Sequence, residues 1–331
     1  MPNHTIIYYH ADCLDGFGAA WAAWRKLGDG ARYLPMHHGQ AWLPDDVAGA
    51  DVFVLDFSFP PAELKAMARL ARSVRQLDHH ASARDAWRGQ LAGDAGSSRT
   101  KFHDAALGLT VEFDMDKSGA RLAWEHFHPE GEVPRAIAHI EDQDLWRFRL
   151  DGTRAFCRAL RLRPFEFAAW DEIVRAAEVT DGAHYRALCA EGEAIDRFLE
   201  VEVARLAGGG LVMPATLHGE PATQPAGPGD GPHRAPGGEP TGRGHPIAGL
   251  AVNANMLFAS ELGHRLATQS GTFGLVWQLA AEGEVKASLR ACGDVDVAAL
   301  AARYGGGGHP NAAGFRMPWR RFMTEVLKLA E

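Results

Sequence analysis

Acidic and imidazole side chains gather in four short segments of this 331-residue chain, and these side chains are typical metal ligands. The segments are His10–Gly16 (HADCLDG), Val54–Ser58 (VLDFS), Asp78–His80 (DHH) and Glu141–Trp146 (EDQDLW). The third is the most informative, because two adjacent histidines after an aspartate suit a metal site better than an apolar core. An imidazole nitrogen binds divalent metals, and a neighbouring carboxylate can accept the other ring N–H and fix the tautomer.

Two further segments stand near the C-terminus, Ser288–Arg290 (SLR) and Gly305–Phe315 (GGGGHPNAAGF). Together with the first four, and in this order, they resemble the DHH phosphoesterase superfamily with its DHH-associated C-terminal domain. The resemblance runs from about residue 5 to residue 318. It implies a phosphoesterase whose C-terminal domain closes over the metal site and holds the substrate.

The resemblance also implies a centre with two divalent cations. Asp56 would be the bridging carboxylate, Asp15, His79 and Asp142 would complete the shell of one cation, and His10 would serve the other. Two adjacent cations supply a nucleophile at neutral pH and neutralise charge on the nonbridging oxygens of a phosphodiester. Mixed nitrogen and oxygen ligands favour manganese, with magnesium or cobalt as alternatives.

The first segment departs from the family pattern, in which one residue separates two aspartates. Here two residues separate Asp12 from Asp15, and in an alignment on Asp15 the missing aspartate falls on Cys13. Asp12 could reach the ligand position, water could replace it, or Cys13 could coordinate. We favour Asp12, because a hard cation prefers carboxylate oxygen to sulfur.

His80 and Asp78 are the catalytic candidates. As a protonated imidazole, His80 could donate to a phosphate oxygen or to the leaving group, and packing beside the ligands is its alternative role. Asp78 would orient a histidine or its own loop. In the fourth segment Asp142 best matches the family aspartate, whereas Asp144 would support a ligand or cap a helix.

The C-terminal segments supply candidate substrate contacts. Arg290 would make a bidentate phosphate contact, with an exposed strand arginine as the alternative. The backbone N–H groups of Gly306, Gly307 and Gly308 could form an anion-binding nest, although such a run alone is usually a flexible turn. His309 and Asn311, which follow directly, favour substrate contact.

The elements that must position these residues alternate in the first half of the chain. Strand-like segments 5–9, 52–56 and 74–77 alternate with helix-like segments 16–27 and 61–72, which predicts βαβ units and a mainly parallel sheet. Ligands bind beyond the carboxyl ends of such strands. His10, Asp56 and Asp78 each follow a strand directly, so they should meet at one edge of the sheet.

The predicted fold is α/β, with a mainly parallel-sheet N-terminal domain flanked by helices, a long connector helix and a smaller α/β C-terminal domain. We expect the catalytic domain over 1–183, the connector over 184–207 and the C-terminal domain over 208–331. Residues 214–246 hold eight prolines and eight glycines and no valine, isoleucine or phenylalanine, so we expect a disordered insertion in the C-terminal domain.

Composition and net charge limit which partners the protein could bind. The net charge of −8 argues against coating of long duplex DNA, yet local cations and metal ions can hold one or two phosphates. No leader signal and no apolar run of about 18 residues is present, so we expect a cytoplasmic protein without a membrane partner. The four cysteines lack C-x-x-C spacing, which indicates neither a zinc knuckle nor a disulfide framework. A homodimer is compatible with the sequence.

The leading hypothesis is a metal-dependent phosphodiesterase or phosphatase that acts on short nucleotides. Its substrates would be very short RNA (nanoRNA), linear or cyclic dinucleotides, or bisphosphorylated adenosine. Pyrophosphate hydrolysis is one alternative. Another is a nucleotide-binding regulatory module whose metal site has decayed, for which the irregular first segment is the only support.

Overall fold

The computed structural model describes residues 4–37, 39–93, 97–179, 182–219 and 245–329. The chain divides into two compact units, Met1–Phe198 and Leu199–Glu331. Each unit contains a six-stranded sheet with helices packed on it. The predicted α/β class with two domains is therefore confirmed.

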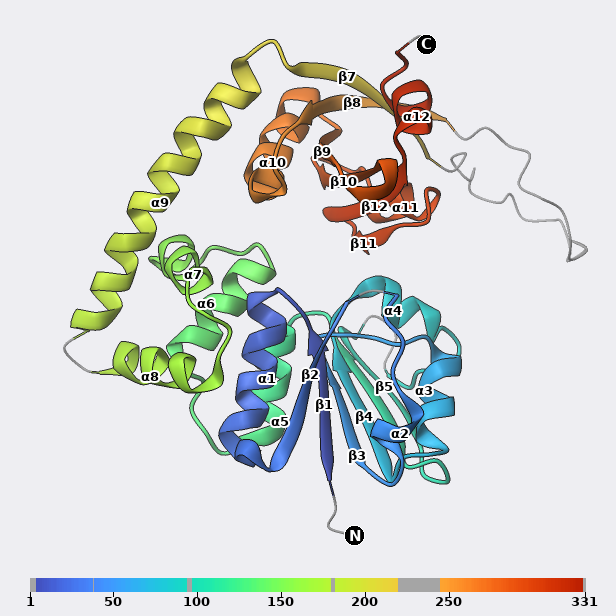
Figure 1. Ribbon diagram of the computed structural model, residues 1–331, viewed down its shortest axis with the longest axis vertical. Coiled ribbons are helices and arrows are strands. Elements are labelled where there is room, and N and C mark those ends of the chain that lie inside the picture. The colour runs from blue at the N-terminus through green and yellow to red at the C-terminus, as the bar shows by residue number, and fades with distance from the viewer. Residues whose placement is uncertain (1–3, 38, 94–96, 180–181, 220–244, 330–331) are drawn as a thin grey trace, which may run out of the picture. The chain divides into compact units, whose positions relative to one another are not determined.

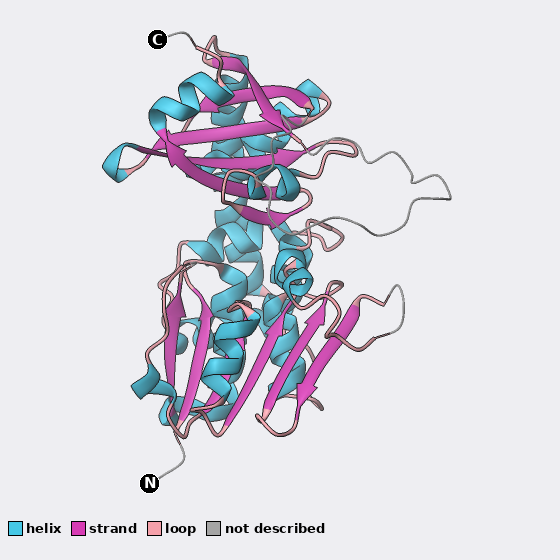
Figure 2. Ribbon diagram, turned by 90° about the vertical axis from the view of Figure 1, so that its right-hand side faces the viewer, coloured by secondary structure: helices cyan, strands magenta, loops and turns pink. Residues whose placement is uncertain are grey.

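The sheet of the first unit has the strand order β2-β1-β3-β4-β6-β5. All its strand pairs are parallel except β5 with β6, and Figure 2 shows this edge strand running opposite to its neighbours. The strands are β1 (Thr5–His10), β2 (Ala31–Met36), β3 (Asp51–Leu55), β4 (Ser73–Asp78), β5 (Arg99–Asp104) and β6 (Leu109–Asp114). The predicted mainly parallel sheet is present.

Helices cover both faces of this sheet (Figure 1). Side chains alternate along a strand, so Ile7 packs in the core on the α1 and α5 side, whereas Ile6 and Tyr8 pack in the core that includes α2 and α3. Burial on both faces explains the continuous apolar runs Ile6–Tyr8 of β1 and Val52–Leu55 of β3. The helices are α1 (Leu14–Leu27), α2 (Pro44–Val47), α3 (Pro61–Ala68), α4 (Ala81–Ala86), α5 (Gly119–Phe127), α6 (Arg135–Asp144), α7 (Thr153–Arg161) and α8 (Phe167–Glu178).

A single helix of 26 residues, α9 (Ala183–Gly208), carries the chain from the first unit into the second. At 1.5 Å per residue its length is about 39 Å. It confirms the predicted connector helix. Within the described residues, no helix is both long and apolar enough to cross a membrane.

The second unit has the strand order β11-β12-β10-β9-β8-β7, in which only β8 and β9 pair in parallel. One face packs on α10 and the other on α11. The strands are β7 (Val212–His218), β8 (Pro246–Asn253), β9 (Phe273–Leu279), β10 (Glu284–Ala291), β11 (Gly307–His309) and β12 (Ala312–Pro318), and the helices are α10 (Ala259–Ser270), α11 (Val297–Ala302) and α12 (Trp319–Arg321).

The insertion predicted over 214–246 is wrong at its first residues. Residues 214–218 belong to β7 and pair antiparallel with β8, whose first residue is Pro246. Pro214 is accommodated because β7 is an edge strand, where a missing N–H does not interrupt the sheet. Residues 220–244 of the predicted insertion lie outside the described residues.

Candidate metal centre

Three neighbouring parallel strands bring the first three segments together. β1 and β4 both pair with β3 and run in the same direction, so their carboxyl ends share one edge of the sheet. His10 is the last residue of β1, Asp56 follows β3, and His79 follows β4. This is the edge at which ligands bind in parallel sheets.

Asp56 lies between two histidines. One carboxylate oxygen, Oδ1, is 3.2 Å from Nε2 of His79, and the other, Oδ2, is 3.6 Å from Nδ1 of His10. The side chain is almost completely buried, and the backbone φ of +51° is in the left-handed region, which is unusual for a residue other than glycine. Such a backbone conformation persists only where the surroundings hold it, which is common at functional sites.

Two groups of potential metal ligands adjoin each other at this edge. In the first, ligand atoms of His10, Cys13 and Asp56 all lie within 4.8 Å of one another. In the second, the same holds for Asp15, His79 and Asp144, and Nε2 of His79 is 3.5 Å from an oxygen of each aspartate. The contact between Asp56 and His79 joins the two groups, as a centre for two cations requires.

The Asp15 carboxylate is fixed by the start of α5. Its Oδ2 accepts a hydrogen bond from the amide of Gly119 at 2.7 Å, and its Oδ1 accepts one from the amide of Ala120 at 2.9 Å. A Cβ atom on Gly119 would lie only 2.3 Å from the Cβ of Asp56. Glycine at this position therefore allows α5 to contact both carboxylates.

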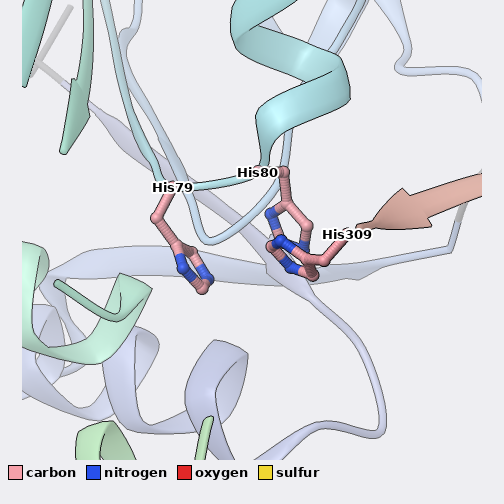
Figure 3. Close-up of side chains that lie close together, drawn as sticks. All are labelled: His79, His80 and His309. Atoms are coloured by element: carbon pink, nitrogen blue, oxygen red, sulfur yellow. The ribbon is translucent and has the colours of Figure 1, made fainter. Parts of the chain in front are cut away.

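Asp78 holds His80 and the segment that joins β4 to α4, from which the rings of His79 and His80 project (Figure 3). Its carboxylate accepts hydrogen bonds from the Ser58 hydroxyl and from the backbone N–H of His79, and it lies 2.7 Å from Nδ1 of His80. Burial alone would lower the pKa of His80, but the charge of Asp78 raises it to about 9. The Asp78 carboxylate thus favours the protonated, hydrogen-bond-donating form of His80.

The electrostatics of the Asp15, Asp56 and Asp144 carboxylates fit bound cations. Burial, followed by the charges of Asp56 and Asp144, raises the pKa of Asp15 well above its usual range. Burial and the charge of Asp56 also raise the pKa of Asp144. Burial would raise the pKa of Asp56 as well, but hydrogen bonds from His10 and His79 hold it below its usual range. Three neighbouring carboxylates with imidazoles between them are a donor set for divalent metals.

The fourth segment contributes Asp144 and not the predicted Asp142. The Asp142 carboxylate accepts hydrogen bonds from the amides of Arg149 and Leu150 at 2.8 and 3.0 Å and from the Thr153 hydroxyl at 2.6 Å. These bonds fix the turn that enters α7, and Asp142 belongs to neither ligand group. The two aspartates are two helix positions apart, so they point in roughly opposite directions.

The first segment also differs from our expectation. The Asp12 side chain is 87% exposed, and its carboxylate lies 4.0 Å from the ring of His37. Cys13, the alternative, is the residue that lies with His10 and Asp56. Burial and the charge of Asp56 raise the pKa of its thiol.

In the second unit, Arg290 and His309 lie in register across the sheet, since both pair with Ala312 of β12. The Arg290 guanidinium donates to the hydroxyls of Ser260 and Ser288 and to the carbonyl of Leu289, at 2.7, 3.1 and 2.8 Å. Burial lowers its pKa to about 10, which leaves it charged at neutral pH. Arg290 is therefore a fixed, half-buried cation and not the freely exposed strand arginine of the alternative.

The glycine run is more ordered than a flexible turn. Gly307 and Gly308 pair with β12, and the Gly306 amide donates to the carbonyl of Ala301. A Cβ atom on Gly306 would lie 2.0 Å from the Gly314 carbonyl oxygen, so close packing requires glycine there. Asn311 is exposed in the turn between β11 and β12. The glycines thus have a structural role that the expected anion nest did not include.

Comparisons with known proteins agree with the C-terminal segments. Residues 250–331 match the DHHA1 domain family, which confirms the predicted DHH-associated domain. An uncharacterized protein of Acanthamoeba polyphaga mimivirus, R106, is 23% identical over 327 residues, which cover 93% of this chain and 66% of the viral protein.

Two solved structures are similar at low identity. RecJ from Thermus thermophilus in complex with Mn2+ has a TM-score of 0.45 and 15% identity, and the match covers 96% of this chain and 50% of that chain. The pGpG-specific phosphodiesterase PggH from Vibrio cholerae has a TM-score of 0.43 and 10% identity, with 96% and 95% covered. This chain therefore spans about half the length of that RecJ.

Proposed function

We propose that this chain, a DHH superfamily protein with a DHHA1 domain, is a metal-dependent phosphoesterase that hydrolyses short nucleotides. The observation that carries the proposal is the position of Asp56 between two adjoining ligand groups. A buried carboxylate whose two oxygens face different groups is suited to bridge two cations.

Different residues would hold the cations and act on the substrate. Asp15, His79 and Asp144 would hold one divalent cation, and His10 would hold the other, with Asp56 shared. Two such cations lower the pKa of a bound water and neutralise phosphate charge. His80, held by Asp78, would donate a proton or a hydrogen bond to a phosphate oxygen or to the leaving group. Manganese is the first candidate, with magnesium or cobalt as alternatives.

The second unit offers side chains that could hold a small phosphorylated substrate. Arg290 on β10 offers a fixed positive charge. His309 and Asn311 follow the glycine run, at the end of β11 and in the turn after it, with β12 between β11 and β10. A chain with a net charge of −8 is poorly suited to long duplex DNA, so we favour nanoRNA, linear or cyclic dinucleotides, or bisphosphorylated adenosine as substrates.

The test is hydrolysis of a substrate panel by the metal-free protein after addition of manganese. The panel contains RNA of two to five residues, cyclic dinucleotides, bisphosphorylated adenosine, pyrophosphate and long single-stranded DNA. Wild type is compared with Asp56→Asn, and Asp12→Asn serves as the matched control because its carboxylate is exposed and outside both ligand groups.

We expect turnover of a short nucleotide by wild type and Asp12→Asn, and a rate below about a tenth of wild type in Asp56→Asn. Preference for pyrophosphate would overturn the proposed substrate class. Binding of a nucleotide without bound manganese and without turnover of any substrate would support the regulatory module instead.

A further inference from the structure

The ligand group of His10 and Asp56 has a third member, and it is a cysteine. Sγ of Cys13, a ring nitrogen of His10 and a carboxylate oxygen of Asp56 all lie within 4.8 Å of one another. They come from three different elements of the fold: the end of β1, the residue before α1 and the residue after β3. Asp56, which is distant in the sequence, thus converges with His10 and Cys13 on one point with N, S and O donors.

The neighbouring carboxylate does not take this position. Asp12 has a backbone φ of +55°, in the left-handed region, and its side chain is 87% exposed. Cys13 has an extended backbone and a half-buried side chain. The turn between β1 and α1 therefore directs Asp12 to solvent and Cys13 to the ligand group, and to exchange them would require a different backbone conformation.

Close packing holds this turn in place. A Cβ atom on Gly16 would lie 2.2 Å from the backbone oxygen of His10 and 2.8 Å from the His10 Cβ. The first turn of α1 thus packs directly on the end of β1. This contact limits how far the intervening residues can move, so the position of the thiol is a property of the fold.

We propose that Cys13 is a metal ligand, and that its thiolate binds the same divalent cation as His10 and Asp56. The inference rests on the proposed two-metal centre and specifies the chemistry of one of its sites. On binding, the S–H bond breaks, the proton passes to solvent, and the sulfur electron pair forms the bond to the cation. A site with one thiolate, one imidazole and one carboxylate is softer than one with two carboxylates, so it favours Zn2+ and Co2+ over Mn2+ and Mg2+.

The experiment is a titration of the metal-free full-length chain with Co2+, followed by electronic absorption. A thiolate ligand produces a sulfur-to-cobalt charge-transfer band in the near ultraviolet, separate from the weak visible bands that report any bound Co2+. Wild type is compared with Cys13→Ser and Cys13→Asp. Cys292→Ser is the matched control, because Cys292 is the other half-buried cysteine and lies in the second unit.

We expect the charge-transfer band in wild type and Cys292→Ser and its loss in both Cys13 variants, which retain visible Co2+ bands. We also expect the ratio of Zn2+ to Mn2+ affinity to fall by at least about tenfold in Cys13→Asp. Bound Co2+ without the band in wild type, or a band that persists in Cys13→Ser, would overturn the role of Cys13 and leave the proposed metal centre standing. If wild type binds no Co2+ at all, the metal centre itself is refuted.

Discussion

Replacement of Gly119 by alanine tests whether α5 and the two buried carboxylates form one unit. The added Cβ would lie 2.3 Å from the Cβ of Asp56 and 2.6 Å from its Oδ1. Ordinary carbon contacts are about 3.5–4.0 Å, so something must move by more than about 1 Å. If α5 moves, the hydrogen bonds to Asp15 weaken, and if Asp56 moves, it leaves His10 and His79.

Metal sites tolerate little of such movement, because ligand distances are held to within about 0.2 Å. We therefore expect Gly119→Ala to weaken Mn2+ binding by at least about tenfold, the usual minimum for loss of a supporting contact. Overpacking should also lower the free energy of unfolding of the metal-free protein by roughly 1–3 kcal/mol.

The assay is calorimetric Mn2+ titration together with urea unfolding of the metal-free protein. The matched control is Gly208→Ala, also a helix residue, at the end of α9, where an added Cβ meets nothing within 4 Å. It should bind Mn2+ as wild type does. If Gly119→Ala binds Mn2+ with wild-type affinity and unfolds at the wild-type urea concentration, the close approach of α5 to Asp56 does not position the ligands.

Three further predictions concern other parts of the molecule. Asp144→Asn should lose Mn2+ affinity, whereas Asp142→Asn should lose roughly 1–3 kcal/mol of stability because its turn hydrogen bonds are weakened. The reverse pattern in Mn2+ titration and urea unfolding would identify Asp142 as the ligand. Burial lowers the pKa of His139 from 6.5 to about 4. As the pH falls, this histidine is therefore protonated in the unfolded state before it is protonated in the folded state, and about 2 kcal/mol of stability should be lost between pH 7 and pH 5. His139→Gln should remove that part of the pH dependence in urea unfolding, and an unchanged profile would contradict the assignment. Arg290→Ala should impair hydrolysis of nucleotides more than that of a small artificial phosphodiester while Mn2+ binding stays unchanged, so equal losses on both substrates would argue against substrate holding.

Much of the site was predictable because parallel strands impose a simple rule. A polar residue directly after an apolar strand lies at the carboxyl edge of the sheet, so Asp56 and His79 could be placed from sequence. Asp144 could have been found by helical periodicity, since it lies four and seven residues after Ile140 and Ile137, which are both buried beside Gly18 of α1.

Other features depend on backbone geometry that residue types do not reveal. Neither residue of the Asp12–Cys13 pair is a glycine, so nothing in the sequence shows that Asp12 adopts a positive φ and that Cys13 faces inward. Likewise, Pro214 begins a proline-rich stretch but is tolerated in a strand, because that strand lies at the edge of the sheet.

The Asp15 carboxylate links the occupancy of the metal centre to the local stability of α5. Its two oxygens accept hydrogen bonds from the amides of Gly119 and Ala120, and the carboxylate also lies beside His79. Cation binding and packing of the first turn of α5 therefore depend on the same two oxygens. A ligand that binds only the folded state adds about 2.7 kcal/mol of stability at a hundredfold excess over its Kd. Hydrogen exchange at these two amides should therefore slow as metal is added, so that a helix terminus reports the occupancy of the candidate metal centre without any substrate.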